Sequence, residues 1–465
     1  ISRAITLWYK ITTFFGGKMV TRRGFIGRAG GALGVTFGVG LALDGAVAAT
    51  TGPSDGWSDE APFRFTGDMT DFEAAQRALL PLYDVERDFA TFDAAYYGAM
   101  TRPVAASYRA YSQWVNRNNS LFLRNAAPGH PRDTELDRSR AAVAKLLGAQ
   151  TEEIALSGGG TEALYALIAN YALLKAGDAV IYADVDYDEM QYACDYLEQS
   201  RGARIVRFSL PEPHTEANIL AAYDRILKET PRAKLLLLTH LSNRNGLVPP
   251  VKAIVAMAKA RGVDVILDSA QAVGHLPFTV EDTGADFIGF SLHKWLAAPL
   301  GTGGIYIRKD RLQDISPWFG NRIHGPEDIR ARIPTGTVDL AARLTIPRAI
   351  AVQDAIGLKA KYRHLVRLRD YWVERVRDIA GLEILVPQEA DRFGAVTGFR
   401  LPGMKGPDGA KQAAKLFLDK YRLLVVAKAG LASGPVLRVT PALFNSSAEL
   451  DRLVAAIRAE RHLFT

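Results

Sequence analysis

The sequence predicts an α/β protein, with a large domain built on a mostly parallel sheet and a smaller C-terminal α/β domain. The chain has 465 residues, of which 48% are hydrophobic. It is therefore too long for one compact core and too apolar to be disordered. Short β-rich runs alternate with helical patterns through the middle of the chain, as in parallel sheets covered by helices on both faces. From about residue 345 the pattern changes, which indicates a second unit.

The middle of the chain supplies the large domain. Apolar residues at helical spacing predict a helix over 161–175 that ends at Gly177. The run 263–267 is apolar enough to form a strand that is buried on both faces. The other expected elements are strands over 179–182, 205–208, 235–239, 287–290 and 304–307, and a helix over 251–261 that Gly262 closes.

The smaller unit begins with a long helical stretch that reaches residue 379. It continues with strands near 384–386 and 396–400, a helix over 409–420, strands over 423–426 and 436–439, and a closing helix from Ser447. We therefore expect four parts along the chain: an N-terminal extension and signal segment (1–48), a linker and arm (49–91), the large domain (92–340) and the small domain (341–465).

The first 48 residues have the features of an export signal. They carry six Lys or Arg and one Asp, which is +5 of the chain's formal +7. After Met19, a twin-arginine pattern (Thr21-Arg22-Arg23-Gly24-Phe25-Ile26) precedes an apolar run over 29–43 and the small-residue cleavage pattern Ala46-Val47-Ala48. The apolar run is short and Asp44 closes it, so we expect no stable membrane anchor. Whether Met19 is the natural start, and whether the signal is cleaved, stays open.

The charge distribution bears on partners and location. Residues 49–465 carry only +2 of the +7, so nucleic acid is not an expected partner despite the basic whole. We expect the twin-arginine export machinery to carry the folded protein to the periplasm. Cys194 is the only cysteine, which excludes a disulfide scaffold and a cysteine-built zinc site. We expect Cys194 to be a buried packing residue and no metal to be bound.

The densest group of polar residues follows two predicted strands. One strand ends at Asp268, before Ser269-Ala270-Gln271, and the other runs into Ser291-Leu292-His293-Lys294-Trp295. The carboxyl ends of parallel strands meet at one edge of a sheet, where open α/β sheets bind ligands. This edge would carry an acid, an amide, a hydroxyl, an imidazole and an amine. Such a set suits pyridoxal phosphate (PLP). A lysine forms the Schiff base with its aldehyde, and a carboxylate keeps its pyridine nitrogen protonated.

A glycine-rich turn supplies a candidate phosphate seat. The segment Ser157-Gly158-Gly159-Gly160-Thr161-Glu162 leads into the predicted helix over 161–175. Free N–H groups and the dipole at a helix N-terminus attract an anion, and glycines let the backbone approach it closely. This turn is weak evidence alone, because it is neither a G-x-G-x-x-G motif nor a P-loop.

Together these motifs resemble the class V aminotransferase family of fold-type I PLP-dependent enzymes. The resemblance runs from Phe92-Asp93-Ala94-Ala95 to the C-terminus, and its most specific part is Asp268-x-Ala270-Gln271 followed by Ser291-x-His293-Lys294-Trp295. The patterns Asp186-Tyr187-Asp188 and Gly336-Thr337-x-Asp339 look closest to the isopenicillin N epimerase-like branch. His275 is expected to be a core or supporting histidine rather than a proton carrier.

The resemblance implies a role for each site residue. Lys294 forms the internal aldimine and Asp268 pairs with the pyridine nitrogen. The other cofactor contacts are Gln271 on the phenolic oxygen, Tyr187 stacked on the ring, Asn243 on the O3′ side, and Thr161, Ser291 and His293 on the phosphate, with Gly160 and Glu162 beside them. Gly336 and Thr337 reach a phosphate in the neighbouring subunit, which implies a homodimer. Arg438 clamps the substrate carboxylate, for which its bidentate fork is suited.

The resemblance leaves the reaction open. The implied substrate is an amino acid or an amino-acid-containing peptide, with Lys294 as general base on the Cα proton and Asp268 stabilising the carbanion. Reprotonation on Cα gives epimerisation and on the cofactor carbon gives transamination. A second base would favour epimerisation, and the sequence does not name one.

Two other activities are weighed against this one. Cysteine desulfurases need a mobile cysteine just before the carboxylate arginine, and residues 425–434 contain none, so desulfurase or C–S lyase activity is less favoured. The alternative is a non-catalytic PLP-binding or sensing protein. The joint presence of Lys294, Asp268 and Arg438 argues against it.

Overall fold

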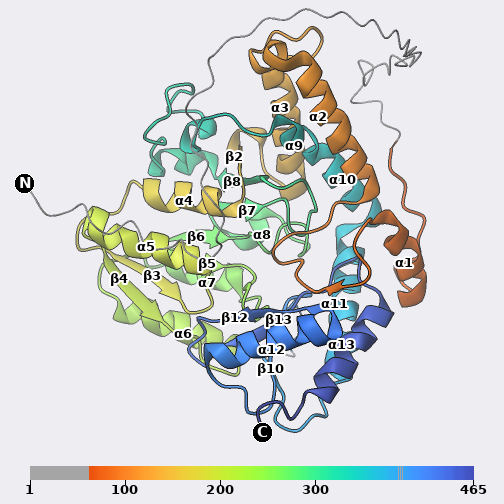
Figure 1. The fold of residues 1–465 in the computed structure, drawn as a ribbon. Helices are drawn as coiled ribbons and strands as arrows, with labels where there is room; N and C mark the ends of the chain where they lie inside the picture. Colours follow the sequence, from red (N-terminus) through yellow and green to blue (C-terminus); the bar gives the residue numbers. More distant parts are fainter. Residues whose placement is uncertain (1–61, 386, 388, 390) are drawn as a thin grey trace, which may run out of the picture. The chain divides into compact units, whose positions relative to one another are not determined.

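The largest sheet of the described residues has seven strands, β2 to β8, which are labelled in Figure 1. The computed structural model describes residues 62–385, 387, 389 and 391–465. The strand order is β2-β8-β7-β6-β5-β3-β4, and β8 alone runs antiparallel to its neighbours. The predicted mostly parallel sheet is confirmed. Its strands are β2 (Ile154–Ser157), β3 (Ala179–Ala183), β4 (Arg204–Phe208), β5 (Ala233–Thr239), β6 (Asp264–Asp268), β7 (Phe287–Ser291) and β8 (Gly303–Ile307).

Helices cover both faces of this sheet. Along β5, Leu235 and Leu237 belong to one buried cluster and Leu236 and Leu238 to another, so alternate side chains enter different cores. The first core contains α4 (Gly160–Asn170) and α5 (Asp188–Arg201), and the second contains α6 (Glu216–Glu229), α7 (Val251–Lys259) and the short α8 (Val280–Thr283). Burial on both faces explains why these strands read as continuous apolar runs.

Two helix boundaries differ from the sequence prediction. The helix expected over 161–175 ends at Asn170. Buried Tyr171 instead forms a β-bridge with Ile315 and donates its hydroxyl to Asp264. The stretch expected to be helical from 345 to 379 is divided by Gly357, whose φ is +84°. It forms α10 (Ile346–Ile356) and α11 (Leu358–Glu374). The apolar spacing along the sequence, from which these helices were predicted, did not indicate either break.

The segment before the sheet contributes α1 (Phe72–Leu79), β1 (Ala90–Thr91), α2 (Arg102–Leu123) and α3 (Arg132–Leu147). Helices α2 and α3 pack against α10, and α2 also packs against α9 (Leu340–Leu344). Strand β1 pairs in parallel with β11 (Leu423–Leu424). The chain before the sheet therefore packs against elements on both sides of residue 345.

A second sheet lies in the C-terminal part. It is antiparallel, in the order β12-β13-β10-β9. Its strands are β9 (Glu383–Ile384), β10 (Thr397–Arg400), β12 (Val426–Lys428) and β13 (Val436–Val439). Helix α12 (Gly406–Tyr421) packs against this sheet, and α13 (Ser447–Ala459) packs against α11 and α12. A bridge between Asp93 and Thr440 joins the chain after β1 to the end of β13.

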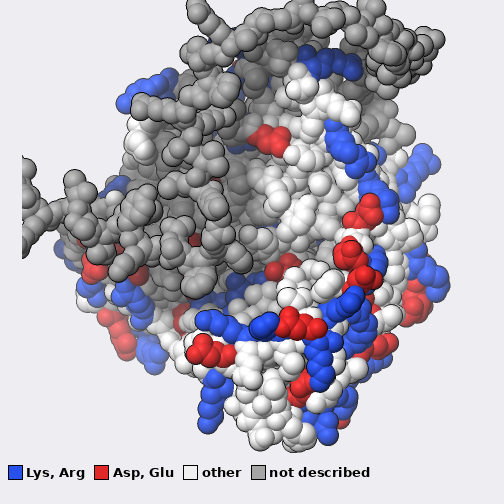
Figure 2. All heavy atoms as spheres, in the orientation of Figure 1, with Lys and Arg blue, Asp and Glu red and all other residues white. Residues whose placement is uncertain are grey.

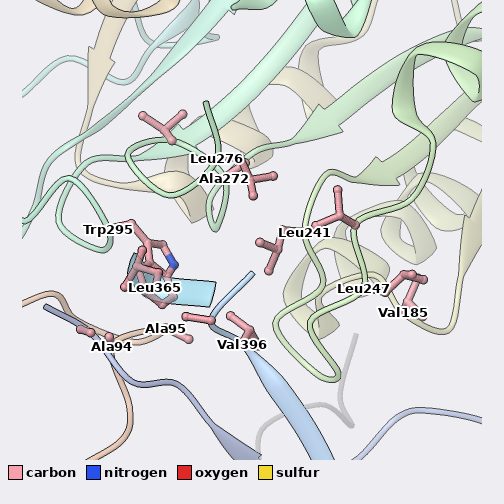
Figure 3. Packing of buried hydrophobic residues seen from close by; sticks show 14 of the residues in the cluster. Ala94, Ala95, Val185, Leu241, Leu247, Ala272, Leu276, Trp295, Leu365 and Val396 are labelled. Atoms are coloured by element: carbon pink, nitrogen blue, oxygen red, sulfur yellow. The ribbon is translucent and has the colours of Figure 1, made fainter. Parts of the chain in front are cut away.

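The hydrophobic core is continuous between the two sheets. Trp295, which follows β7, belongs to the same buried cluster as Leu365 of α11 and Val396, just before β10 (Figure 3). The described residues lie in one compact unit. The division into domains at residue 340 stays a prediction, and the export segment lies outside the described residues.

The surface and helices of the described part give two further facts. On the face drawn in Figure 2, Lys and Arg side chains are interspersed with Asp and Glu. Among the described helices, none combines the length and apolar character that a bilayer crossing requires.

Candidate active site

A cavity of about 470 Å³ opens at the carboxyl ends of β5, β6 and β7. The structure gathers eleven predicted site residues in its wall: Gly160, Thr161, Glu162, Tyr187, Asn243, Asp268, Gln271, Ser291, His293, Lys294 and Arg438. The wall also contains residues that the sequence reasoning missed, among them Tyr96, Thr239 and Lys428. The strand-end arrangement expected for open α/β sheets is therefore present.

The glycine turn between β2 and α4 lies against the end of β7. The Gly160 N–H donates to Ser291 Oγ at 3.0 Å. A Cβ on Gly160 would lie 2.6 Å from that oxygen and 3.0 Å from the Cβ of Ala270. Gly159 has a φ of +146°, and Glu162 accepts a hydrogen bond from the Gly158 N–H at 3.1 Å. The N–H groups of Gly158 and Gly160 are thus engaged within the protein, and the positive end of the α4 dipole is the feature that can attract an anion here.

Asp268 and Lys294 lie in the same cavity, at the ends of neighbouring strands. Asp268 is 5% exposed and accepts the Ala270 N–H at 2.9 Å. Burial raises the pKa of Asp268, while this hydrogen bond and Lys294 oppose the rise. Burial lowers the pKa of Lys294 to about 8, against the effect of Asp268, and the nearby cations Arg438 and Lys428 lower it further. A sizeable fraction of the Lys294 amine is then neutral near pH 8, as a nucleophile or base requires.

The backbone of Lys294 is held by Gly98. The Gly98 N–H donates to the His293 carbonyl at 3.0 Å. A Cβ on Gly98 would come within 1.7 Å of the Lys294 carbonyl oxygen. No other residue type fits this contact without moving the lysine.

Gln271 is fixed by two hydrogen bonds. Its Oε1 accepts the Trp295 indole N–H at 2.8 Å, and its Nε2 donates to the Ala95 carbonyl at 2.8 Å. An indole N–H only donates, so the amide has one orientation, and the second Nε2 hydrogen remains available to an acceptor. Beneath it, buried His275 tilts against Trp295 and accepts the Ala395 N–H. Burial lowers the pKa of His275 to about 3, so it is a neutral core histidine, as expected.

His293 lies over the glycine turn. Its Nδ1 contacts the Thr302 carbonyl at 2.9 Å, which requires the proton on Nδ1 and leaves Nε2 free. A Cβ on Gly159 would lie 3.2 Å from its ring. Burial lowers the pKa of His293, and the hydrogen bond to Thr302 opposes this.

Tyr187 and Asn243 form another part of the wall. Asp186, which precedes Tyr187, accepts the N–H groups of Ala183 and Thr239 and so joins the ends of β3 and β5. Tyr187 itself is half-buried at the start of α5. Asn243 is 8% exposed, and its side-chain oxygen has no hydrogen-bond partner within the described residues.

Arg438 enters the cavity from β13 and is 3% exposed. It donates to the Asn243 carbonyl at 2.9 Å and forms an ion pair with Asp93. Burial lowers the pKa of Arg438, and Asp93 opposes this. The sequence reasoning missed Asp93 as a site residue, because this partner lies 345 positions away along the chain.

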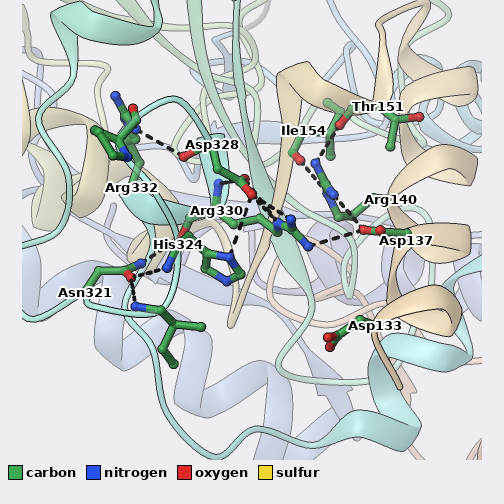
Figure 4. Close-up of polar contacts among 12 residues, drawn as sticks. Asp133, Asp137, Arg140, Thr151, Ile154, Asn321, His324, Asp328, Arg330 and Arg332 are labelled. Atoms are coloured by element: carbon green, nitrogen blue, oxygen red, sulfur yellow. Dashed lines mark hydrogen bonds and ion pairs between the residues drawn. The ribbon is translucent and has the colours of Figure 1, made fainter. Parts of the chain in front are cut away.

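Gly336 and Thr337 lie outside the cavity that contains Lys294. They are exposed and line a different cavity, of about 500 Å³, with Asp137, Arg140 and Arg330. In that wall Arg140 and Arg330 both approach Asp137, and Arg330 also pairs with Asp328 (Figure 4). The structure does not bring Gly336 and Thr337 to the Lys294 cavity of their own chain, and their contact with a neighbouring subunit stays a prediction.

The Lys294 cavity fits PLP on three observations. Glycines at 158–160 let the backbone lie closer to Glu162, His293 and Ser291 than a Cβ would allow, and this backbone lines the cavity. The buried oxygen of Asn243 lacks a partner among the described residues. A buried acid and an amine of lowered pKa lie at one end. No group of three or more metal-ligating side chains occurs in the described part of the chain. Fold and site together define a fold-type I PLP-dependent protein.

Comparison with known proteins gives the family. The chain belongs to the aminotransferase class-V family, whose model matches residues 102–453. It is 28% identical to the isopenicillin N epimerase of Streptomyces clavuligerus, over 69% of this chain and 83% of that protein. It is also 30% identical to a cysteine desulfurase of Yersinia pestis (strain Pestoides F), over 70% of this chain and 82% of the relative.

A solved structure shows the same fold. The C-DES mutant with glycine covalently linked to its PLP cofactor has a TM-score of 0.69 and 17% identity, and covers 84% of this chain and 99% of its own. The expectations of family, fold class and PLP cofactor are confirmed. The relatives differ in their named activities, so the particular reaction is a separate question.

Proposed function

We propose that this protein is a PLP-dependent enzyme that removes the Cα proton of an amino acid or an amino-acid-containing peptide. The observation that carries the proposal is the shared cavity of Lys294, Asp268 and Arg438. These residues supply an amine, an acid and a carboxylate receptor, and a protein that only bound the cofactor would not need all three.

Each residue has a task that its environment supports. When bound, PLP supplies an electron-accepting ring that stabilises negative charge on the substrate Cα. Asp268 would hold a proton on the ring nitrogen, and burial of Asp268 strengthens this interaction. Lys294 holds the cofactor and then accepts the Cα proton at Nζ, since its lowered pKa leaves it partly neutral.

The remaining wall orients the cofactor. Gln271 offers its second amide hydrogen to the phenolic oxygen, and Asn243 lies on the O3′ side. Tyr187 covers the ring. Gly160, Thr161 and Glu162 at the start of α4 would hold the phosphate on one side, and Ser291 and His293 on the other. Arg438 receives the substrate carboxylate.

The outcome is transamination or epimerisation. Similarity to isopenicillin N epimerase supports the epimerase-like branch. Mass spectrometry and chiral chromatography of products separate the two, with a panel of amino acids and small peptides incubated with and without an α-keto acid. Transamination gives keto products only with the acceptor, whereas epimerisation inverts Cα without it.

Lys294→Ala is the matched control. We expect it to lose both the product and the visible absorbance of a lysine-linked cofactor. Undiminished turnover in Lys294→Ala would contradict the proposal. Binding of amino acids without any product in the wild type would instead favour a sensing protein.

A desulfurase is the second candidate, because relatives carry that name. The only cysteine, Cys194, lies buried in α5, and burial raises the pKa of its thiol. It is also not in the wall of the cavity. A desulfurase that uses a protein thiol is therefore disfavoured. If the protein released sulfide from cysteine and Cys194→Ala did so too, the result would favour a C–S lyase reaction.

We also propose a homodimer in which Gly336 and Thr337 reach the partner's phosphate. The exposed position of both residues outside their own cavity supports it. Light scattering gives the mass in solution. In each mixed dimer of Lys294→Ala and Thr337→Arg chains one of the two sites is intact. Random mixing should therefore restore about a quarter of the wild-type activity, as expected for sites shared between identical subunits.

Export by the twin-arginine route is proposed on the segment 21–48. Fractionation of cells that express the full chain, compared with Arg22→Lys/Arg23→Lys, measures it. Loss of the periplasmic pool in the double variant is expected. An unchanged periplasmic pool would contradict the proposal.

A further inference from the structure

Lys428 lies in the same cavity wall as Arg438 and has no role in the functions described above. It ends β12, which pairs antiparallel with β13. Val426 is opposite Arg438, and Lys428 is two positions further along, so both cations project from one face of the sheet as diagonal neighbours. That spacing is within reach of long side chains.

The two cations differ in how they are paired. Arg438 already donates to the Asn243 carbonyl and contacts Asp93, while its Nε is buried without a partner. Lys428 is half-buried, and its amine makes no hydrogen bond or ion pair with any described residue. Arg244 and Asp188, which also act on Lys428, pair with each other, so the two cations Lys428 and Arg438 with the one carboxylate of Asp93 leave one positive charge in excess. That excess matches a single carboxylate from a ligand.

The segment that carries Lys428 is held in place. Buried Arg244 donates to the Ala429 carbonyl and pairs with Asp188 of α5. Farther along, the Ala432 N–H donates to Asp184 at 2.9 Å. These contacts after Lys428, together with the β12–β13 pairing before it, reduce the entropy lost when Lys428 binds a ligand.

We propose that Lys428 and Arg438 together bind the substrate carboxylate, and that Asp93 competes for the same cations. Arg438 alone cannot offer both end nitrogens, since Asp93 engages one and the Asn243 carbonyl the other. An incoming carboxylate binds Lys428 and displaces Asp93 from Arg438, whose Nε has no partner among the described residues. Asp93 pairs with Arg438 when no substrate is bound, and its charge also attracts the unpaired Lys428 amine. This inference rests on the proposed function, because it assumes an amino-acid substrate.

The test compares ligands with and without a carboxylate. Spectral titration of the PLP-loaded protein gives apparent Kd values for L-norvaline and for butylamine, which keeps the amine and side chain but lacks the carboxylate. We expect Lys428→Met to weaken norvaline binding about tenfold, as for loss of a charged hydrogen bond, and to leave butylamine unchanged. Lys428→Arg should retain most of the affinity. Lys411→Met, an exposed lysine of α12, is the matched control.

Substitution of Asp93 should change the affinity for norvaline in the opposite direction. Asp93→Asn removes the competing carboxylate, so norvaline should bind more tightly. Equal effects of Lys428→Met on both ligands, or no effect on either, would overturn the inference. So would weaker norvaline binding in a folded Asp93→Asn protein.

A second readout does not depend on the cofactor. Ligand-detected NMR of propionate with the cofactor-free protein should show binding that Lys428→Met reduces and Lys411→Met does not. If the loaded wild type responds to neither norvaline nor butylamine, the proposed function fails, and the propionate measurement alone decides the carboxylate site. Propionate binding that is the same in wild type and Lys428→Met would then overturn it.

Discussion

Trp295 donates its indole N–H to the Oε1 of Gln271 at 2.8 Å, and this bond, with that from Nε2 to the Ala95 carbonyl, sets which end of the amide faces the cofactor cavity. Without it, Gln271 can turn its oxygen toward the phenolic oxygen of PLP, where two acceptors would face each other. The pair thus connects a core tryptophan to cofactor binding.

We expect Trp295→Phe to weaken PLP binding by about 2- to 10-fold, the range for one hydrogen bond. The measurement is retention of cofactor absorbance during dialysis against a series of PLP concentrations. Trp372→Phe is the matched control, since this buried tryptophan of α11 has an N–H without a partner. Equal loss of affinity in both variants would assign the effect to core packing instead.

The close contact between Gly160 and Ser291 predicts that Gly160→Ala will damage the phosphate seat. The added Cβ would lie 2.6 Å from Ser291 Oγ. Either the serine or the start of α4 must shift, at a cost of about 1–3 kcal/mol in the free energy of unfolding. Urea denaturation and PLP titration measure the two effects. Gly320→Ala serves as control, because its new Cβ meets no atom closer than 4.0 Å.

Gly430 allows the contact that fixes the segment after Lys428. Its φ is +101°, and an added Cβ would overlap the Arg244 guanidinium. We expect Gly430→Ala to displace this segment and raise the KM for the amino-acid substrate more than it weakens PLP binding. Gly434→Ala is the control, since Gly434 has a φ of +113° but open space around it. If Gly434→Ala raised KM equally, backbone strain rather than the Arg244 contact would be responsible.

Buried histidines predict a stability change in acid. Burial lowers the pKa of His364 to about 4, and Arg367 lowers it further. Between pH 6.5 and 4 the unfolded chain then holds a proton on this residue that the folded protein lacks. The free energy of unfolding therefore falls as the pH is lowered through this range. Asp186 has the opposite effect on this free energy, because burial raises its pKa to about 7. The contribution of His364 is therefore measured as the difference between the wild type and a His364 variant.

Between pH 7 and pH 5, we expect the free energy of unfolding of His364→Gln to fall by about 1–2 kcal/mol less than that of the wild type. Denaturant unfolding at each pH measures it. His462→Gln, at an exposed histidine, should follow the wild-type profile. Parallel profiles for wild type and His364→Gln would show that the folded protein protonates His364 normally.

The central part of the fold could be predicted because its signals are local. Alternation of apolar runs and helical periods predicts β3 to β8 to within a residue or two, since strands buried on both faces leave a continuous apolar run. The helix ends at Asn170 and Gly357 could not be predicted in this way. The first depends on a bridge between Tyr171 and Ile315, which the local sequence does not contain.

The sequence by itself determined which chemical groups the site has. Asp268, Gln271, Ser291, His293 and Lys294 lie at or just after strand ends, where the sheet must bring them to one edge. Only the tertiary structure decided how those groups are paired. Asp93 meets Arg438, Lys428 faces the same cavity without a partner, and Trp295 orients Gln271. The physical reason is that a hydrogen bond or ion pair depends on distance in space, and local sequence patterns carry no information about residues 345 positions apart.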